Sequence, residues 1–276
     1  MISTPAPLSQ SETAGGAITV DSLGMTFDLG KQSLTALAGI SLEMKHGEFC
    51  SFIGPSGCGK STLLRLIAGL IEPSVGTVRV DGEDAATARQ KRKFGFVFQD
   101  AVLLPWRTVI ENIELPMIVA HVPKQERRQK AKDLLDLVGL ADFAQVAPAK
   151  LSGGMARRVA IARSLVLDPS ILLLDEPFGS LDEITRQRMN VELQRIWAAE
   201  RCTAVLVTHN VGEAVFLSDR VIVLGARPGR IIAERIIDLP RPRTLEMIGE
   251  PRFFEHTRQL SGVLLSGAVV GAESDA

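Results

Sequence analysis

A glycine-rich segment, GPSGCGKST from Gly54 to Thr62, constrains the fold of this chain more than any other feature. It follows the apolar run Phe49 to Ile53, which predicts a buried strand, and it leads into a helical pattern from Lys60 to Leu70. Glycines at such a junction let several backbone N–H groups point at one spot, and the helix adds the positive end of its dipole. The segment therefore predicts an anion-binding loop in an α/β fold.

The segment also fits the pattern G-x-x-x-x-G-K-[ST], which predicts a phosphate-binding loop for a nucleotide. Lys60 would reach the β- and γ-phosphates, and the Ser61 hydroxyl would ligate Mg²⁺. A chance glycine turn would match this pattern in roughly one chain per hundred, and the flanking strand and helix make chance rarer still. The residues expected to hold the phosphates are Gly54, Pro55, Ser56, Gly57, Cys58, Gly59, Lys60, Ser61 and Thr62.

A second apolar run ends in two acids, in the sequence ILLLDEP. A carboxylate at the end of a buried strand beside a phosphate loop is well placed for Mg²⁺, so Asp175 is the expected metal ligand. Glu176, the next residue, could polarise an attacking water. The alternative is a strand-ending turn, which Pro177 would also suit.

Apolar runs alternate with helical patterns along the chain, which predicts βαβ units and a mainly parallel sheet. The runs at 17–20, 40–44 and 77–80 alternate in polarity, as antiparallel strands do, and 101–150 is strongly helical. The expected fold is therefore an α/β P-loop (RecA-like) core with a small antiparallel layer and an inserted helical subdomain at about 101–160. The expected organisation is a disordered lead over 1–16, an α/β domain over 17–230, and a tail over 231–276 with a short helix at about 253–265.

The segment LSGG places Ser152, Gly153 and Gly154 at the start of an amphipathic helix. A hydroxyl, exposed N–H groups and a helix dipole make a second anion site, and a second site suggests phosphate supplied by another subunit. Taken alone, the same residues would be an ordinary helix N-cap.

Six motifs occur in one order: GPSGCGKST, FQD, LSGG, LLLDEP, SLDE and VTHN. In this order and spacing the chain resembles the ATP-binding-cassette (ABC) family over residues 17 to 230. The sequence departs from the commonest family pattern at Met155, Ser180 and Asn210, and none of these positions supplies a phosphate, metal or water contact in the family scheme. The resemblance therefore implies a competent ATPase that uses ATP and Mg²⁺.

The resemblance also implies residue roles. Glu176 would be the general base, His209 would contact the γ-phosphate, and Gln99 would sense the γ-phosphate and Mg²⁺. Phe27 would stack on adenine. The remaining roles lie between subunits, where the residues closing over the partner copy's ATP would be Ser152, Gly153, Gly154 and, at the interface, Asp182.

The implied partners are a second copy of the ATPase, separate transmembrane permease subunits and, indirectly, a solute-binding protein. The chain would then act at the cytoplasmic face of the plasma membrane. Similarity to the nitrate, sulfonate and taurine importer subgroup rests on LLPW, DEPFGSLDEITR, ARPGRI and LPRPR. Two alternatives stay open, namely a non-transport cassette ATPase and a P-loop nucleotide-binding module or kinase.

Composition agrees with this interpretation. A net charge of −1 favours no nucleic-acid partner, and three widely spaced cysteines favour a reducing compartment. We find no secretory signal at the start of the chain and no apolar run long enough to cross a bilayer. Outside the motifs, we expect His46, His121 and His256 to face solvent and Trp106 to pack in the core.

Overall fold

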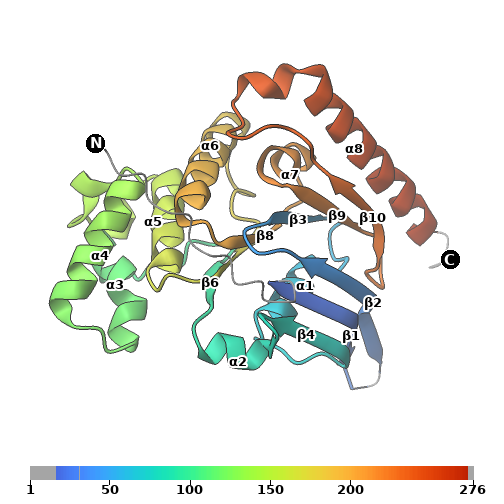
Figure 1. The fold of residues 1–276 in the computed structure, drawn as a ribbon, viewed down its shortest axis with the longest axis horizontal. Coiled ribbons are helices and arrows are strands. Elements are labelled where there is room, and N and C mark those ends of the chain that lie inside the picture. The colour runs from blue at the N-terminus through green and yellow to red at the C-terminus, as the bar shows by residue number, and fades with distance from the viewer. Residues whose placement is uncertain (1–16, 31, 273–276) are drawn as a thin grey trace, which may run out of the picture.

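Two β-sheets with helices around them form the part of the chain that the computed structural model describes, residues 17–30 and 32–272, with side chains up to residue 266 (Figure 1). The expected lead over 1–16 lies outside the described residues. The arrangement confirms an α/β fold with a parallel core, an antiparallel layer and a helical region.

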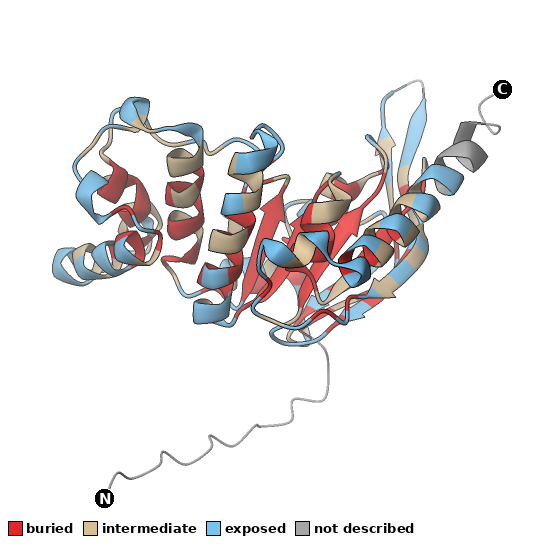
Figure 2. Cartoon of the chain, turned by 90° about the horizontal axis from the view of Figure 1, so that it is seen from above, coloured by how far each residue is buried: buried red, intermediate tan, exposed pale blue. Residues whose placement is uncertain are grey.

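The larger sheet has six strands in the order β10-β9-β3-β8-β7-β6. Its strands from β9 to β6 pair in parallel, whereas β10 pairs with β9 antiparallel. Every residue of β3, β7 and β8 is buried, because helices or the second sheet cover both faces (Figure 2). The strands are β3 Phe49–Ile53, β6 Phe94–Val97, β7 Ile171–Asp175, β8 Thr203–Val207, β9 Arg220–Leu224 and β10 Ile231–Ile236.

The smaller sheet is antiparallel in the order β2-β1-β4-β5. The three alternating runs all lie in it, although its first two strands extend into a long hairpin that the sequence patterns did not delimit. The strands are β1 Ile18–Asp28, β2 Ser33–Met44, β4 Val75–Val80 and β5 Glu83–Asp84.

Helices α3 and α4 lie beyond the edge strand β6 and contact α5, which forms the helical region that the sequence predicts (Figure 1). The Thr108 hydroxyl accepts from the Glu111 N–H while the Glu111 carboxylate accepts from the Thr108 N–H, so a reciprocal cap begins α3. The helices are α1 Lys60–Ile67, α2 Ala85–Gln90, α3 Val109–Val119, α4 Lys124–Leu137, α5 Gly153–Leu165, α6 Glu183–Glu200, α7 Val211–Leu217 and α8 Pro251–Ala272.

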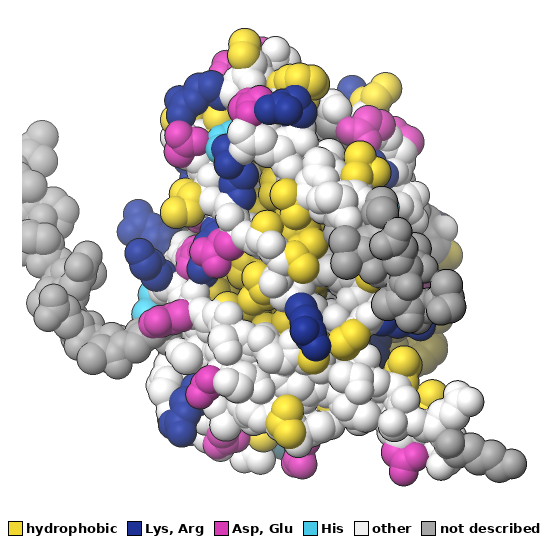
Figure 3. All heavy atoms as spheres, turned by 90° about the vertical axis from the view of Figure 1, so that its right-hand side faces the viewer, with side chains coloured by type: hydrophobic (Ala, Val, Ile, Leu, Met, Phe, Trp, Pro, Cys, Tyr) yellow, Lys and Arg dark blue, Asp and Glu magenta, His cyan; other side chains and the backbone are white. Residues whose placement is uncertain are grey.

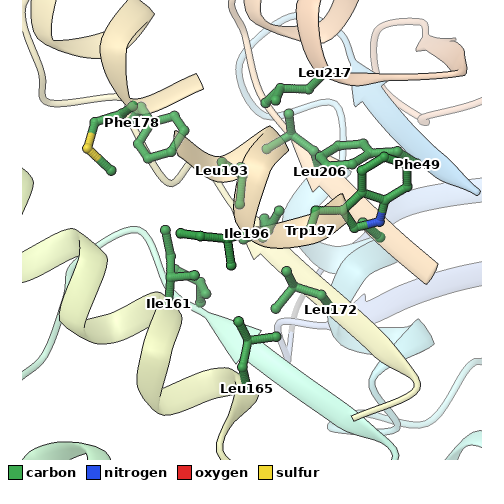
Figure 4. Close-up of a cluster of buried hydrophobic side chains, with 14 of the residues drawn as sticks. Phe49, Ile161, Leu165, Leu172, Phe178, Leu193, Ile196, Trp197, Leu206 and Leu217 are labelled. Carbon is green, nitrogen blue, oxygen red and sulfur yellow. The ribbon is translucent and has the colours of Figure 1, made fainter. Parts of the chain in front are cut away.

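The main hydrophobic core lies between the parallel sheet and helices α5, α6 and α7 (Figure 4). Phe49 of β3 meets Trp197 of α6 edge to face, with ring centroids 5.3 Å apart. Ile161 and Leu165 of α5 approach the same cluster from the side of β6. The core thus fixes the strand ends from which the acids and the glycine loop emerge.

The tail differs from its expected form in two respects. Residues 231–236 form strand β10, so the sheet extends past position 230, and the helix expected at 253–265 runs from Pro251 to Ala272. Figure 3 shows the side on which β10 and α8 end, with hydrophobic side chains grouped near the centre of the face. Exposed hydrophobic residues of these two elements include Ile232, Ile236 and Leu265.

Two side-chain predictions were wrong. Trp106 is 76% exposed, because the 101–107 segment is a surface loop rather than part of a packed helix. His256 is 5% exposed, because α8 packs on the core and buries it between Asp238, whose carboxylate lies 2.8 Å from Nε2, and Arg235. Among the described residues, no helix is long and apolar enough to cross a membrane.

Candidate functional site

The loop from Gly54 to Thr62 joins β3 to α1, as the sequence predicts. Gly57 and Gly59 adopt φ values of 75° and 97°, in the left-handed region that side chains disfavour. The buried Lys60 side chain folds back, and its Nζ donates to the carbonyl oxygens of Gly54 and Pro55, both at 2.9 Å. The loop is therefore a backbone cradle with one ammonium group held inside it.

Ser61 and Asp175 meet beside the loop, where the Ser61 hydroxyl donates to Asp175 Oδ1 at 2.8 Å. Burial raises the pKa of Asp175, while the Ser61 hydrogen bond opposes that rise. A buried carboxylate next to a hydroxyl, with a phosphate cradle adjoining, is the hard-oxygen donor set that Mg²⁺ takes. The residues present therefore fit this ion.

Glu176 and His209 lie side by side at the ends of β7 and β8, with Glu176 Oε2 3.1 Å from His209 Nδ1. The Glu176 backbone has φ 45°, an uncommon value for a residue other than glycine, and its N–H donates to Val207 at 2.8 Å. This bond holds the Glu176 backbone in its uncommon conformation, from which the carboxylate projects toward His209. Parallel pairing of β7 with β8 brings the two motifs together across 33 residues.

An open cavity of about 460 Å³ lies over the phosphate loop. Gln99 and Phe27 both line it, together with Glu176 and residues of the loop. The Gln99 backbone carbonyl accepts a hydrogen bond from Arg157 of α5, so this position is tied to the helical region. Sequence patterns missed three further lining residues, Leu34, Ala36 and Arg227, since the β1–β2 hairpin and the turn after β9 reach the loop only in the folded chain.

Ser152, Gly153, Gly154 and Asp182 do not line this cavity. Ser152 caps α5 by accepting from the Met155 N–H, and Asp182 caps α6 by accepting from the Thr185 N–H. The two caps adjoin, since a Cβ on Gly153 would lie 3.8 Å from the Leu181 side chain. These two caps lie at the start of α5 and α6, outside the cavity over the phosphate loop of the same chain.

A buried network supports the loop of His209. Glu213 of α7 accepts a hydrogen bond from the Thr208 hydroxyl, which itself accepts from the Asn210 N–H at 3.0 Å. Asn210 Oδ1 in turn accepts from the Glu213 N–H at 2.9 Å. The only sequence signal for this role is the N-x-x-E spacing typical of a helix start.

A phosphate cradle with its lysine, a serine–aspartate pair and a glutamate–histidine pair at one sheet edge define a P-loop nucleoside-triphosphatase site. The sequence profile of the family described as ABC transporter matches residues 37–179. The chain belongs to the ABC transporter family and is an ATP-binding, ATP-hydrolysing subunit of that family.

The individual proteins to which this chain is similar are also named as ATP-binding proteins of transport systems. The chain is 46% identical over 247 residues to an ABC transporter ATP-binding protein of Methanocaldococcus jannaschii, covering 90% of this chain and 91% of that one. It is 44% identical to the nitrate import ATP-binding protein NrtD of Synechocystis, covering 90% and 94%. It is also 46% identical to the bicarbonate transport ATP-binding protein CmpC of Synechococcus elongatus, covering 86% of this chain and 36% of that longer protein.

A solved structure, the dimeric post-hydrolysis state of the ATP-binding cassette MJ0796 bound to ADP and Pi, is similar with a TM-score of 0.71 and 34% identity. The match covers 81% of this chain and all of that one.

Proposed function

We propose that two copies of this chain enclose two ATP molecules, each held between the phosphate loop of one copy and Ser152–Gly154 of the other. The observation that carries this is that Ser152–Gly154 cap α5 and do not line the cavity over the phosphate loop of the same chain. A dimer would supply each site with both segments. The similar cassette MJ0796 is described as dimeric, which supports the same arrangement.

Within each site, Glu176 would accept a proton from the attacking water. His209, 3.1 Å away, would orient that carboxylate and donate to the γ-phosphate. Lys60 and the loop N–H groups would stabilise the charge of the transferring group. Ser61, Asp175 and Gln99 would hold Mg²⁺, which supplies positive charge to the β- and γ-phosphate oxygens.

Phe27 would stack on the adenine, since it lines the cavity together with Leu34, its cross-strand partner in the β1–β2 hairpin. Asp182 would lie at the interface between the two copies. The dimer would close when ATP binds and reopen after hydrolysis. The free energy of ATP binding would in this way drive a conformational change.

The substitution Glu176→Gln tests this assignment. We expect the variant to bind ATP with Mg²⁺ as the unsubstituted chain does, but to release phosphate at least about 100-fold more slowly, the usual loss when a general base is removed. Binding is measured by calorimetry, turnover by phosphate release, and dimer formation by light scattering. The control is Glu192→Gln, a partly exposed residue on α6, which should behave like the unsubstituted chain. Normal turnover by Glu176→Gln would contradict the assignment of the base.

For the driven process we propose uptake of a small solute of the nitrate, sulfonate or taurine class, through separate permease subunits at the cytoplasmic face of the membrane and fed by a solute-binding protein. The names of relatives, nitrate import and bicarbonate transport, support an importer of small anions.

The permease would dock in an apolar groove between β6 and α3. This groove is lined by the apolar residues Phe94, Phe96, Phe98, Leu115, Pro116 and Val119, and also by Arg92 and Arg163. Phe98 and Val119 are 48% and 69% exposed, which is unusual for large apolar residues that no partner covers. Phe98, which lines the groove, directly precedes Gln99, which lines the ATP cavity. A docked helix would therefore contact the segment that reaches this cavity.

A further inference from the structure

Arg227 belongs to the ARPGRI segment after β9, yet it lines the cavity over the phosphate loop together with Lys60 and Phe27. Its Nε donates to the Gly57 carbonyl oxygen at 3.0 Å. A Cβ on Gly57 would lie 2.7 Å from Arg227 Nη2 and 3.4 Å from Cζ, so the guanidinium lies directly against the loop backbone. Glycine at position 57 leaves room for that approach.

The turn that carries Arg227 is hydrogen-bonded to β2 and packs against the phosphate loop. The Gly229 N–H donates to Ala36 at 2.9 Å, and the Ala38 N–H donates to Gly229 at 3.0 Å, which ties the turn to β2. A Cβ on Gly229 would lie 2.1 Å from the Cys58 carbonyl oxygen. The guanidinium is therefore held beside the phosphate loop by backbone contacts of Gly229 with β2 and with Cys58.

The charge of Arg227 has no partner of opposite sign in the described part of the chain, where none of the ion pairs includes it. Its Nε alone is engaged, by a backbone oxygen, so its two terminal nitrogens remain available to an anion. A guanidinium binds phosphate oxygens through two parallel hydrogen bonds and keeps its charge at all physiological pH values.

We propose that Arg227 is a nucleotide-binding residue that contacts the phosphate chain of ATP as a second cation beside Lys60. This inference rests on ATP binding at the phosphate loop, and it goes beyond the motif residues because position 227 lies in none of the six motifs. The contact would be made in the ground state as well as during reaction, so it would govern affinity rather than the chemical step.

The test measures nucleotide binding in the Glu176→Gln background, where ATP is not consumed. We expect Arg227→Ala to raise the dissociation constants of ATP, ADP and inorganic triphosphate about 10- to 100-fold, the range for loss of a hydrogen bond to a charged group. In the chain that retains Glu176, KM for ATP should rise while kcat at saturating ATP changes less than twofold. Arg227→Lys should recover part of the affinity. The matched control is Arg230→Ala, an exposed arginine that does not line the cavity.

Three results would overturn the proposal, and each differs from failure of the ATPase assignment, which would show as loss of ATP binding by Glu176→Gln itself. The first is unchanged triphosphate affinity in Arg227→Ala. The second is full recovery by Arg227→Gln, whose neutral amide can still donate to Gly57, which would mean that the residue only tethers the loop. The third is weaker ATP binding with normal ADP and triphosphate binding, which would place Arg227 at the dimer interface.

Discussion

Glu213 is a buried carboxyl whose protonation state the fold itself controls. Burial raises its pKa from 4.5 to about 7, and the Thr208 hydrogen bond only partly offsets the effect. One of its oxygens, Oε1, is buried without a hydrogen-bond partner in the described structure. The native state therefore favours the neutral carboxylic acid beside the loop of His209.

This raised pKa predicts that stability falls as pH rises. Between pH 4.5 and 7 the native state retains a proton that the unfolded chain has released, so the free energy of unfolding decreases across that window and levels off above it. At about 1.4 kcal/mol per pKa unit, the loss from this group is about 3 kcal/mol at most. Chemical denaturation of the unsubstituted chain and Glu213→Gln at a series of pH values checks this.

In Glu213→Gln the decrease in the free energy of unfolding between pH 4.5 and 7 should be smaller by about 3 kcal/mol, because the amide cannot ionise. The partly exposed Glu192→Gln serves again as the control, and its slope should equal that of the unsubstituted chain. Identical slopes in all three proteins would mean that Glu213 ionises at an ordinary pH.

At the scale of elements, the buried Arg243 side chain and backbone link the tail after strand β9 to helices α6 and α7 by hydrogen bonds. Arg243 is 2% exposed, and its guanidinium donates to the carbonyl oxygens at the end of α7, at 2.7 Å to Val215, 3.0 Å to Phe216 and 2.7 Å to Ser218. The Gln194 side chain of α6 bonds both backbone groups of Arg243. Burial lowers the Arg243 pKa to about 10, which leaves it charged at neutral pH.

This arrangement predicts that the tail stabilises the ATPase fold. Arg243→Met should lower the free energy of unfolding by about 3 kcal/mol or more, because it leaves several buried carbonyl oxygens of α7 without donors. Denaturant titration measures the change. Arg252→Met, which removes an exposed ion pair with Asp238, should cost less than about 1 kcal/mol. Equal, small losses in both variants would show that α7 does not depend on the tail.

At the scale of the whole molecule, the proposed docking groove between β6 and α3 shares no lining residue with the cavity over the phosphate loop. Val119→Asp places a charge in the groove and should reduce co-purification with the permease at least tenfold, because the buried carboxylate would be desolvated. Basal ATP hydrolysis by the isolated subunit should stay within twofold of normal. The control, Phe254→Asp, alters an equally exposed apolar residue on α8 and should retain the permease.

Retention of the permease by Val119→Asp would contradict the docking site. Loss of ATPase activity in that variant would instead mean that the groove belongs to the core of the fold. The two measurements therefore separate a partner surface from a structural one.

Several features of this protein can be predicted directly from its sequence. The fold class and the phosphate loop follow from local patterns, since a buried strand, a glycine turn and a helix each leave a short-range signal. Asp175 and Glu176 carry the same kind of signal, at the end of an apolar run. The family follows from six motifs in order. These features depend on neighbours within a few residues, which is the range over which sequence patterns are informative.

Contacts between distant segments depend on tertiary structure alone. Strand pairing places His209 next to Glu176. The β1–β2 hairpin and the turn after β9 bring Leu34 and Arg227 to the nucleotide cavity. Packing of the tail buries His256. Trp106 shows the converse, an aromatic residue that sequence statistics place inside and the fold leaves outside. Exposure and long-range contact are properties of the packed chain, because they are set by which surfaces meet when sheets and helices assemble.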